Sequence, residues 1–361
     1  MGTKLGLVGL PNAGKSTLFN ALTSGHAAVA PYPFTTTDRN VGVAPVEDPR
    51  LTALAACLSP ERVIPTTIEV VDIAGLVKGA HEGEGLGNQF LSHVFGVDAL
   101  VHVVRCFDEG QVAHPIGAVD PVRDVEVVTT ELLLKDLELI GRRKEKDQKL
   151  AKGGDQHALH LVGLLDRWAA AVSGGTPIRK MGLAAEEHPN AFGLDLLSAK
   201  PVLYAANVGE EASASLVERL RRLADGDGAQ LVVCCAKLEA ELVELEPEDR
   251  AMMMKELGLV ESALPQVIQH SYALLQLVTF FTTVSRILQA WTVPRGTKAP
   301  QAAGTIHTDF ERQFIRAEVI SADALVRCGS EAAARSQGLL RLEGKEYVVQ
   351  DGDVLHVRVG T

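Results

Sequence analysis

A glycine-rich segment near the N-terminus, Gly9-Leu10-Pro11-Asn12-Ala13-Gly14-Lys15-Ser16, constrains the fold more than any other part of the sequence. The apolar run from Leu5 to Val8 precedes it and is typical of a buried strand, and apolar residues at helical spacing follow from Thr17. The segment therefore has the form GxxxxGKS between a strand and a helix, which is the context that a phosphate-binding P-loop requires. We expect an α/β domain that binds a nucleoside triphosphate at this loop.

Each part of the motif has a physical role toward a triphosphate. The glycines let backbone N–H groups converge on phosphate oxygens, and the helix N-terminus adds its partial positive charge. Lys15 is expected to bridge the outer phosphates, which makes it a catalytic as well as a binding residue, and Ser16 to offer its hydroxyl to Mg²⁺. The nucleotide-binding residues expected in the loop are Asn12, Ala13, Gly14, Lys15, Ser16 and Thr17.

Two further segments fit the same machinery. The run from Val63 to Val71 reads as a strand that ends in Asp72-Ile73-Ala74-Gly75. There the Asp72 carboxylate can hold Mg²⁺ through water, and the Gly75 N–H can reach the γ-phosphate. Between this strand and the P-loop, Tyr32-Pro33-Phe34-Thr35-Thr36-Thr37 occupies the place of the switch threonine that completes the magnesium shell. The residues alone leave the choice among the three threonines open.

The base-reading loop departs from the guanine-binding pattern. The strand-like run 202–206 leads into Asn207-Val208-Gly209-Glu210, where typical GTPases carry Asn-Lys-x-Asp and the aspartate accepts two hydrogen bonds from guanine. Here Val208 replaces the lysine, and Glu210 is one methylene longer than aspartate. Adenine presents an acceptor and a single amino donor, so we expect relaxed or adenine-favouring recognition. A further strand-like run ends in Cys235-Ala236-Lys237, which matches the loop that closes over the base.

Composition and charge exclude several classes of protein. The formal net charge of -11 argues against indiscriminate binding to nucleic acid. No apolar run reaches the roughly 18 residues of a membrane span, and the N-terminus lacks the pattern of a secretory signal. We therefore expect a cytoplasmic protein without a membrane partner. The five cysteines show no CxxC spacing, so neither a disulfide framework nor a zinc site is indicated.

Between the Asp72 motif and the base loop, the sequence predicts an inserted helical hairpin. Apolar residues recur at helical spacing from Val125 to Lys152, Gly153-Gly154 breaks the pattern, and Leu159 to Trp168 resumes it. The end of the first helix is basic, with Arg142, Arg143, Lys144, Lys146, Lys149 and Lys152 against Glu145 and Asp147. A solvated helix face and a contact with RNA both explain this run, and the sequence leaves the two open.

The C-terminal segment reads as a separate unit. Short strand-like runs, broken by Glu343-Gly344-Lys345 and Asp351-Gly352-Asp353, follow the apolar stretch from Phe280 to Val293. Nothing in this part of the sequence pairs a nucleophile with a base. We therefore assign the unit to binding partners rather than to catalysis.

These motifs resemble the YchF-type, or Obg-like, ATPases of the translation-factor P-loop class, and the resemblance runs nearly end to end. Its most specific segments are Tyr32-Pro33-Phe34, Asn40-Val41-Gly42-Val43, Asp72 to Ala80, Gly83 to Asn88, Val103-Val104-Arg105-Cys106-Phe107 and Asn207 to Glu210. The family usually has Asn before the Tyr-Pro-Phe segment, whereas this chain has Pro31, a departure that we do not expect to touch the chemistry.

The resemblance implies a fold class and domain boundaries. It implies an α/β P-loop nucleoside-triphosphatase domain over residues 1–127 and 200–277, an inserted α-helical coiled-coil hairpin over 128–199, and a small ubiquitin-like β-rich TGS domain over 278–361. It also implies a monomeric, Mg²⁺-dependent ATPase with weak intrinsic turnover. The implied partners are the ribosome, as large subunit or whole particle, and ribosomal RNA. Thr36 is then the switch threonine, and the backbone of Val208 reads part of the adenine.

Water activation needs its own explanation, because Leu76 stands directly after the Asp72 motif, where Ras-like enzymes carry a glutamine. The resemblance implies that His114 is catalytic, and a neutral imidazole can orient water. Asn12 also resembles the P-loop asparagine of potassium-activated relatives, in which this side chain helps to hold a potassium ion that supplies positive charge against the phosphates. Two other functions stay open at this point: an Obg-type GTPase in ribosome assembly, and a nucleotide-gated binding module with negligible turnover.

Overall fold

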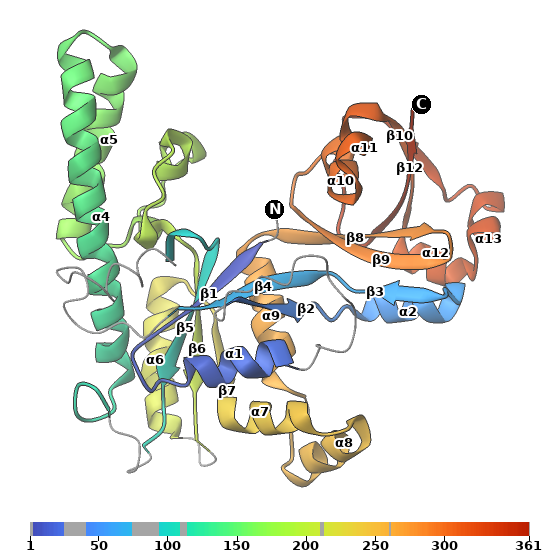
Figure 1. Cartoon of the computed structure of the whole chain (residues 1–361), viewed down its shortest axis with the longest axis horizontal. Helices are drawn as coiled ribbons and strands as arrows, with labels where there is room; N and C mark the ends of the chain where they lie inside the picture. Colours follow the sequence, from blue (N-terminus) through green and yellow to red (C-terminus); the bar gives the residue numbers. More distant parts are fainter. Residues whose placement is uncertain are drawn as a thin grey trace. The chain divides into compact units, whose positions relative to one another are not determined.

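The computed structural model describes residues 3–24, 41–73, 94–108, 114–209, 213–259 and 261–360, and the chain forms two compact units. The first unit contains Met1–Ala44 and Glu69–Ser271, and the second contains Pro45–Ile68 and Tyr272–Thr361 (Figure 1). Three expected site residues, Thr36, Gly75 and Glu210, lie outside the described residues, so their roles stay predictions.

The first unit is built on a six-stranded sheet in the order β2-β4-β1-β5-β6-β7. β1 pairs in parallel with β4 and β5, β5 with β6, and β6 with β7. Every residue of β5 and β6 is buried, as expected for central strands of a parallel sheet that is covered on both faces. The α/β P-loop architecture is therefore confirmed. The strands are β1 (Lys4–Val8), β2 (Val41–Pro45), β4 (Thr67–Asp72), β5 (Ala99–Arg105), β6 (Val202–Asn207) and β7 (Leu231–Cys234).

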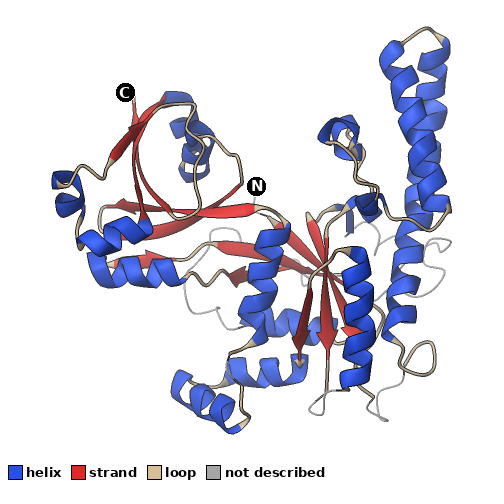
Figure 2. Cartoon of the chain, turned by 180° about the vertical axis from the view of Figure 1, so that it is seen from behind, coloured by secondary structure: helices blue, strands red, loops and turns tan. Residues whose placement is uncertain are grey.

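Helices pack around this sheet (Figure 2). α1 starts at the end of the P-loop and α7 starts directly after β7, so both helices direct their N-termini to the carboxyl edge of the sheet. α4 and α6 pack on the core through residues such as Val125, Leu132 and Leu220. The helices along this part of the chain are α1 (Lys15–Ser24), α4 (Pro121–Lys152), α5 (Gln156–Ser173), α6 (Ala214–Asp227), α7 (Ala236–Glu244), α8 (Pro247–Glu256) and α9 (Ala263–Leu274).

α4 and α5 are the two helices that the sequence predicts between the Asp72 motif and the base loop, and they lie side by side (Figure 1). Asp120 and Asp155 cap their N-termini by accepting backbone N–H bonds, and the chain turns at Gly153-Gly154. Their buried seam includes Leu133 and Trp168. Even the 32 residues of α4 do not form a stretch apolar enough to cross a membrane, and neither does any other helix in the described part of the chain.

A buried carboxylate fixes the base of this hairpin. Asp136 on α4 has no exposed surface and accepts N–H bonds from Leu197 (2.7 Å) and Ser198 (2.8 Å), shortly before β6 begins. Burial raises the pKa of Asp136 to about 6, and hydrogen bonds from the Leu197–Ser198 segment oppose that rise. The hairpin is therefore tied to the strand that carries the base-reading loop.

The second unit is built on a mixed six-stranded sheet in the order β11-β10-β12-β8-β9-β3. β8 and β12 are parallel neighbours at its centre, the pairs β8–β9, β10–β11 and β10–β12 are antiparallel, and β3 runs parallel to β9 at one edge. Ser285 and Arg286 make the turn between β8 and β9, with left-handed φ angles of 51° and 61°. The strands are β3 (Arg62–Ile64), β8 (Leu277–Val284), β9 (Ile287–Pro294), β10 (Phe314–Ser321), β11 (Arg341–Glu343) and β12 (Asp353–Val359), and the helices are α2 (Pro49–Leu58), α10 (Ala299–Ile306), α11 (Thr308–Gln313), α12 (Ala322–Cys328) and α13 (Glu331–Ser336).

The segment after β2 differs from the sequence prediction. The single strand expected over 63–71 is two strands, β3 and β4, in different sheets, because Pro65 between them has no N–H to donate to a ladder. Residues Pro45–Ile68, expected in the nucleotide-binding domain, pack with the second unit. Arg50 on α2 anchors them there through an ion pair with Asp351 (2.8 Å).

We expect Asp136→Ala to lower the free energy of unfolding by about 2–4 kcal/mol, because it leaves two buried N–H groups without an acceptor. Urea titration followed by circular dichroism measures the change. Glu126→Ala, at an exposed position of the same helix, is the matched control and should change the free energy by less than about 0.5 kcal/mol. Equal stability of the two variants would show that the Asp136 bonds do not hold the hairpin.

Candidate nucleotide-binding site

The P-loop lies so close to the neighbouring strands that two of its glycines have no room for a side chain. A Cβ added to Gly9 would lie 2.3 Å from the Val103 carbonyl oxygen on β5, and one added to Gly14 would lie 2.1 Å from Asn207 Nδ2. Gly9 and Gly14 have positive φ angles of 153° and 93°, and Asn12 has a φ of 63°. The loop is therefore held in a backbone conformation of the kind in which successive N–H groups surround an anion.

Asn207 joins the P-loop to the base-reading loop. Its Nδ2 donates to the Ala13 carbonyl oxygen (2.9 Å), and its Oδ1 accepts from the Ala236 N–H at the start of α7 (3.0 Å). Asn207 ends β6, where it pairs with Arg105 of β5 and Cys234 of β7, and it is buried. The expected residues Ala13, Asn207 and Ala236 are thus brought together by one side-chain amide.

Lys15 is held inside the loop. It is 6% exposed, and its Nζ donates to the Leu10 carbonyl oxygen (2.8 Å). Burial lowers the pKa of Lys15 to about 8, and the nearby Asp72 carboxylate opposes that effect. The anionic oxygens of a triphosphate would stabilise the ammonium form that burial disfavours. Electrostatics therefore match this position to a phosphate ligand.

Ser16 and Asp72 form an oxygen-donor pair beside Lys15. Ser16 Oγ donates to Asp72 Oδ2 (2.7 Å), which brings the start of α1 to the end of β4. Asp72 Oδ1 is buried and accepts no hydrogen bond from the residues that the structure describes. A hydroxyl and a carboxylate with an unused oxygen are ligands that Mg²⁺ accepts when phosphate and water complete its octahedral shell. These residues therefore fit a magnesium ion.

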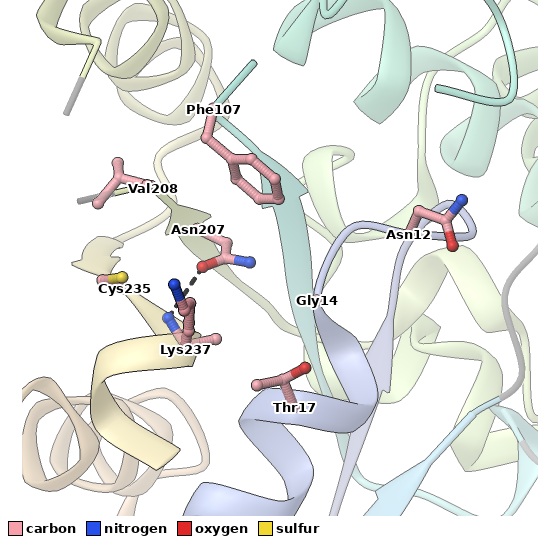
Figure 3. A pocket seen from close by; sticks show the side chains of 10 residues that line it. Asn12, Gly14, Thr17, Phe107, Asn207, Val208, Cys235 and Lys237 are labelled. Atoms are coloured by element: carbon pink, nitrogen blue, oxygen red, sulfur yellow. Dashed lines mark hydrogen bonds between the residues drawn. The ribbon is translucent and has the colours of Figure 1, made fainter. Parts of the chain in front are cut away.

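A cavity of about 240 Å³ opens beside the P-loop at the carboxyl edge of the sheet (Figure 3). Asn207, Val208, Cys235 and Lys237 lie on one side of it, and Gly14 and Thr17 lie on the other. The complete lining is Asn12, Gly14, Thr17, Phe107, Asn207, Val208, Gly209, Cys235, Ala236 and Lys237. Phe107 ends one of the most specific segments of the sequence, but the sequence pattern does not indicate a role for its side chain. The apolar walls suit the faces of a purine ring.

The backbone of Val208 is already engaged within the protein. Its N–H donates to the Cys234 carbonyl oxygen on β7 (2.9 Å), and its side chain is buried at the cavity wall. A backbone contact from Val208 to a base therefore has to use its carbonyl oxygen, which is an acceptor. Adenine offers its amino group as a donor to such an acceptor.

His114 lies against the first turn of α4. Its Nδ1 accepts from the Ile116 N–H (3.2 Å), so the neutral ring carries its proton on Nε2, which donates to Asp124 Oδ2 (2.8 Å). The His114 and Asp124 side chains are each 4% exposed. Both ring nitrogens are thus used inside the protein, and the structure does not group His114 with Lys15. Its catalytic role stays a prediction.

Comparison with known proteins agrees with this geometry. A family model described as "50S ribosome-binding GTPase" matches residues 4–144, and the YchF GTPase C-terminal model, described as "Protein of unknown function (DUF933)", matches residues 277–360. The first match contains the P-loop and Asp72. The second covers most of the second structural unit.

Relatives match along nearly the whole chain. The chain is 47% identical to the "Ribosome-binding ATPase YchF" of Bacillus subtilis and 48% identical to that of Haemophilus ducreyi, with 99% of each chain covered in both cases. Among solved structures, the Schizosaccharomyces pombe YchF GTPase is 35% identical, with a TM-score of 0.88 over 99% of this chain and 97% of that one. The chain therefore belongs to the YchF family of P-loop enzymes that hydrolyse nucleoside triphosphates.

Proposed function

We propose that this protein is an ATPase that hydrolyses ATP with Mg²⁺, acts on GTP less well, and associates with the ribosome according to the nucleotide bound. The observation that carries the nucleotide preference is the cavity beside the P-loop, whose wall contains Val208 where a GTPase has lysine. The proposal of ribosome association is supported by the names of the relatives. A cytoplasmic monomer is the simplest form consistent with both.

Base choice follows from what the cavity offers. Guanine binding in the usual loop needs a carboxylate that accepts two hydrogen bonds and a lysine stem over the ring. Val208 removes the stem, and its carbonyl can accept the single amino donor of adenine. Phe107 and Cys235 add apolar surface to the cavity wall. This surface favours binding of a purine ring but does not distinguish the hydrogen-bonding edge of adenine from that of guanine.

The residues around the phosphates have distinct roles. Lys15 and the N–H groups of the P-loop would hold the outer phosphates and counter the charge that develops on them. Ser16 and Asp72 would hold Mg²⁺, with Thr36 and Gly75 assigned by the sequence to the metal shell and the γ-phosphate. When bound, the metal ion supplies positive charge to the phosphate oxygens. The chain itself positions the reacting groups.

Orientation of the attacking water is assigned to His114, since Leu76 has no group that bonds to water. In the described conformation His114 is bonded to Asp124 and Ile116. To use Nε2 on a water molecule, the ring has to leave Asp124. The potassium ion stays a prediction that rests on Asn12, which lines the cavity with a left-handed backbone.

The hairpin supplies a basic surface for RNA. Three residues of the basic run near the end of α4 form ion pairs within the hairpin: Arg142 with Glu138, Arg143 with Asp147, and Lys144 with Asp166. Lys146, Lys149 and Lys152 are exposed and make no ion pair with the residues that the structure describes. These three lysines, the tip lysines, can neutralise backbone phosphates even on a protein of net charge -11. The α4–α5 hairpin is therefore the inserted coiled-coil domain that we propose as the site of RNA contact.

The second unit is assigned as a ubiquitin-like TGS domain. Its strand order places the first strand of a hairpin, β8, beside the last strand, β12, in parallel, with antiparallel pairs outside them. α10 packs on this sheet through Ala299, Ala302 and Ala303. This arrangement supports a small partner-binding module.

We expect ATP to bind at least as tightly as GTP in a competition assay with a fluorescent nucleotide. Val208→Lys with Glu210→Asp should shift the preference toward GTP by about 1 to 3 kcal/mol, the scale of a bidentate base contact. Val63→Lys, an exposed residue of the second unit, is the control for the added charge. Tenfold tighter GTP binding by the natural protein would instead indicate an Obg-type GTPase.

We expect His114→Ala to lower ATP turnover by about 10- to 1000-fold with little change in ATP affinity, because the residue acts on water and not on the nucleotide. Phosphate release and calorimetry measure the two quantities. His157→Ala, an exposed histidine on α5, is the control. Unchanged turnover in His114→Ala would leave the residue only its structural bonds to Asp124 and Ile116. Negligible turnover in the natural protein would indicate a nucleotide-gated binding module.

We expect replacement of the three tip lysines by glutamine to weaken binding to ribosomes. The slope of log affinity against log salt should fall by about 2 to 3, because each lysine neutralises one phosphate. Cosedimentation at several salt concentrations measures this. A variant with Arg221, Arg222 and Lys255 replaced by glutamine loses the same charge from exposed positions outside the hairpin. Equal weakening of the two variants would contradict a contact at the tip.

A further inference from the structure

Arg105, the last residue of β5, is a buried cation that the proposed mechanism does not use. It is 2% exposed and pairs in the sheet with Asn207 of β6. Arginine is almost never fully buried unless its guanidinium is well partnered. It belongs to the Val103–Phe107 segment, one of the most specific in the sequence, which the phosphate and metal chemistry leaves without a role.

Arg105 contacts Phe107 in two ways. Its Nε donates to the Phe107 carbonyl oxygen (3.1 Å), and its Cζ lies 4.6 Å from the centroid of the Phe107 ring. The first contact fixes the backbone just beyond the strand, and the second places the guanidinium over the Phe107 ring. The same ring lines the cavity beside the P-loop (Figure 3). The guanidinium therefore restrains a wall of the cavity without lining the cavity itself.

We propose that Arg105 is a positioning residue that holds the Phe107 ring as a stacking surface for the base of the bound nucleotide. The inference rests on the proposed function, since it takes the cavity to be the base site. Stacking on an aromatic ring is tolerant of base identity, because every base has a π-face. Phe107 and Arg105 should therefore add affinity for ATP and GTP alike, and none for a triphosphate that has no base.

The test compares binding of ATP with binding of inorganic tripolyphosphate, each with Mg²⁺, to the full chain by calorimetry. Phe107→Ala should weaken ATP binding by about 5- to 100-fold, the scale of one base stacked on an aromatic ring. Arg105→Lys keeps the charge but loses the planar stack and the Nε donor, and it should weaken ATP binding by about 3- to 30-fold. Both variants should bind tripolyphosphate within about twofold of the natural protein, because tripolyphosphate has no base to stack on Phe107.

A double variant separates positioning from a direct role. If Arg105 acts only through Phe107, Arg105→Lys should have no further effect in the Phe107→Ala background. Additive losses, or equal losses of ATP and tripolyphosphate binding in Arg105→Lys, would overturn the proposal, as would an Arg105→Lys variant that binds ATP normally. If circular dichroism shows that Arg105→Lys does not fold, Arg105→Met takes its place, with the same expected pattern.

The outcomes for the natural protein and for Phe107→Ala distinguish this inference from the proposed function. A natural protein that binds tripolyphosphate but gains nothing from the adenosine of ATP would refute the base site itself. A natural protein that binds ATP tightly, with Phe107→Ala unchanged, would refute only the stacking wall. ATP hydrolysis would stand in the second case.

Discussion

The nucleotide site depends on one buried side-chain amide. Asn207 donates to the P-loop and accepts from the first N–H of α7, so it fixes the phosphate site and the base loop relative to one another. The contact is close enough that position 14 can only be glycine. The two bonds of Asn207 also explain how the sequence of the base loop can differ from the guanine-binding pattern while the scaffold is kept. Asn207 bonds to protein, whereas Val208 and Glu210 occupy positions that face the base in the guanine-binding pattern. The chain therefore departs from that pattern where base choice is set and keeps it where the scaffold is held together.

The elements that could be predicted from the sequence are those whose structure is determined by residues within one short segment of the chain. The P-loop follows a strand, and Asp72 and Asn207 each end one. Parallel strands bring these ends to one edge of the sheet, as the bond between Ser16 and Asp72 confirms. The helices of the hairpin were predictable because their buried residues recur at helical spacing. The roles of Thr36, Gly75 and Glu210 rest on the sequence alone.

The features that the sequence did not predict have causes that are not local. Residues 45–68 pack with the second unit through contacts such as that of Arg50 with Asp351, 301 positions away, which no pattern within a segment shows. The run of β-branched residues around Pro65 reads as one strand, although its two halves belong to different sheets. Phe107 is a lone aromatic residue after a strand, and only the cavity shows which way it faces.

The bond between His114 and Asp124 places the proposed catalysis and the proposed RNA contact on one helix. Asp124 lies in the first turn of α4, and Lys149 lies in its last turn, roughly 38 Å away at 1.5 Å per residue. Between these two turns, α4 is buried along one side at Leu133 and Ile140 and is held by the bonds of Asp136. If His114 orients water, it has to exchange a buried charge-assisted hydrogen bond for one to the water molecule. That loss has a cost for the buried Asp124 carboxylate, whose other ion pair, with Arg123, spans 3.5 Å. A force on the hairpin that shifts the first turn of α4 would change that cost directly. Coupling between the two distant sites would require a second arrangement of this hydrogen bond, because a coupled element has to have two states that both sites bias.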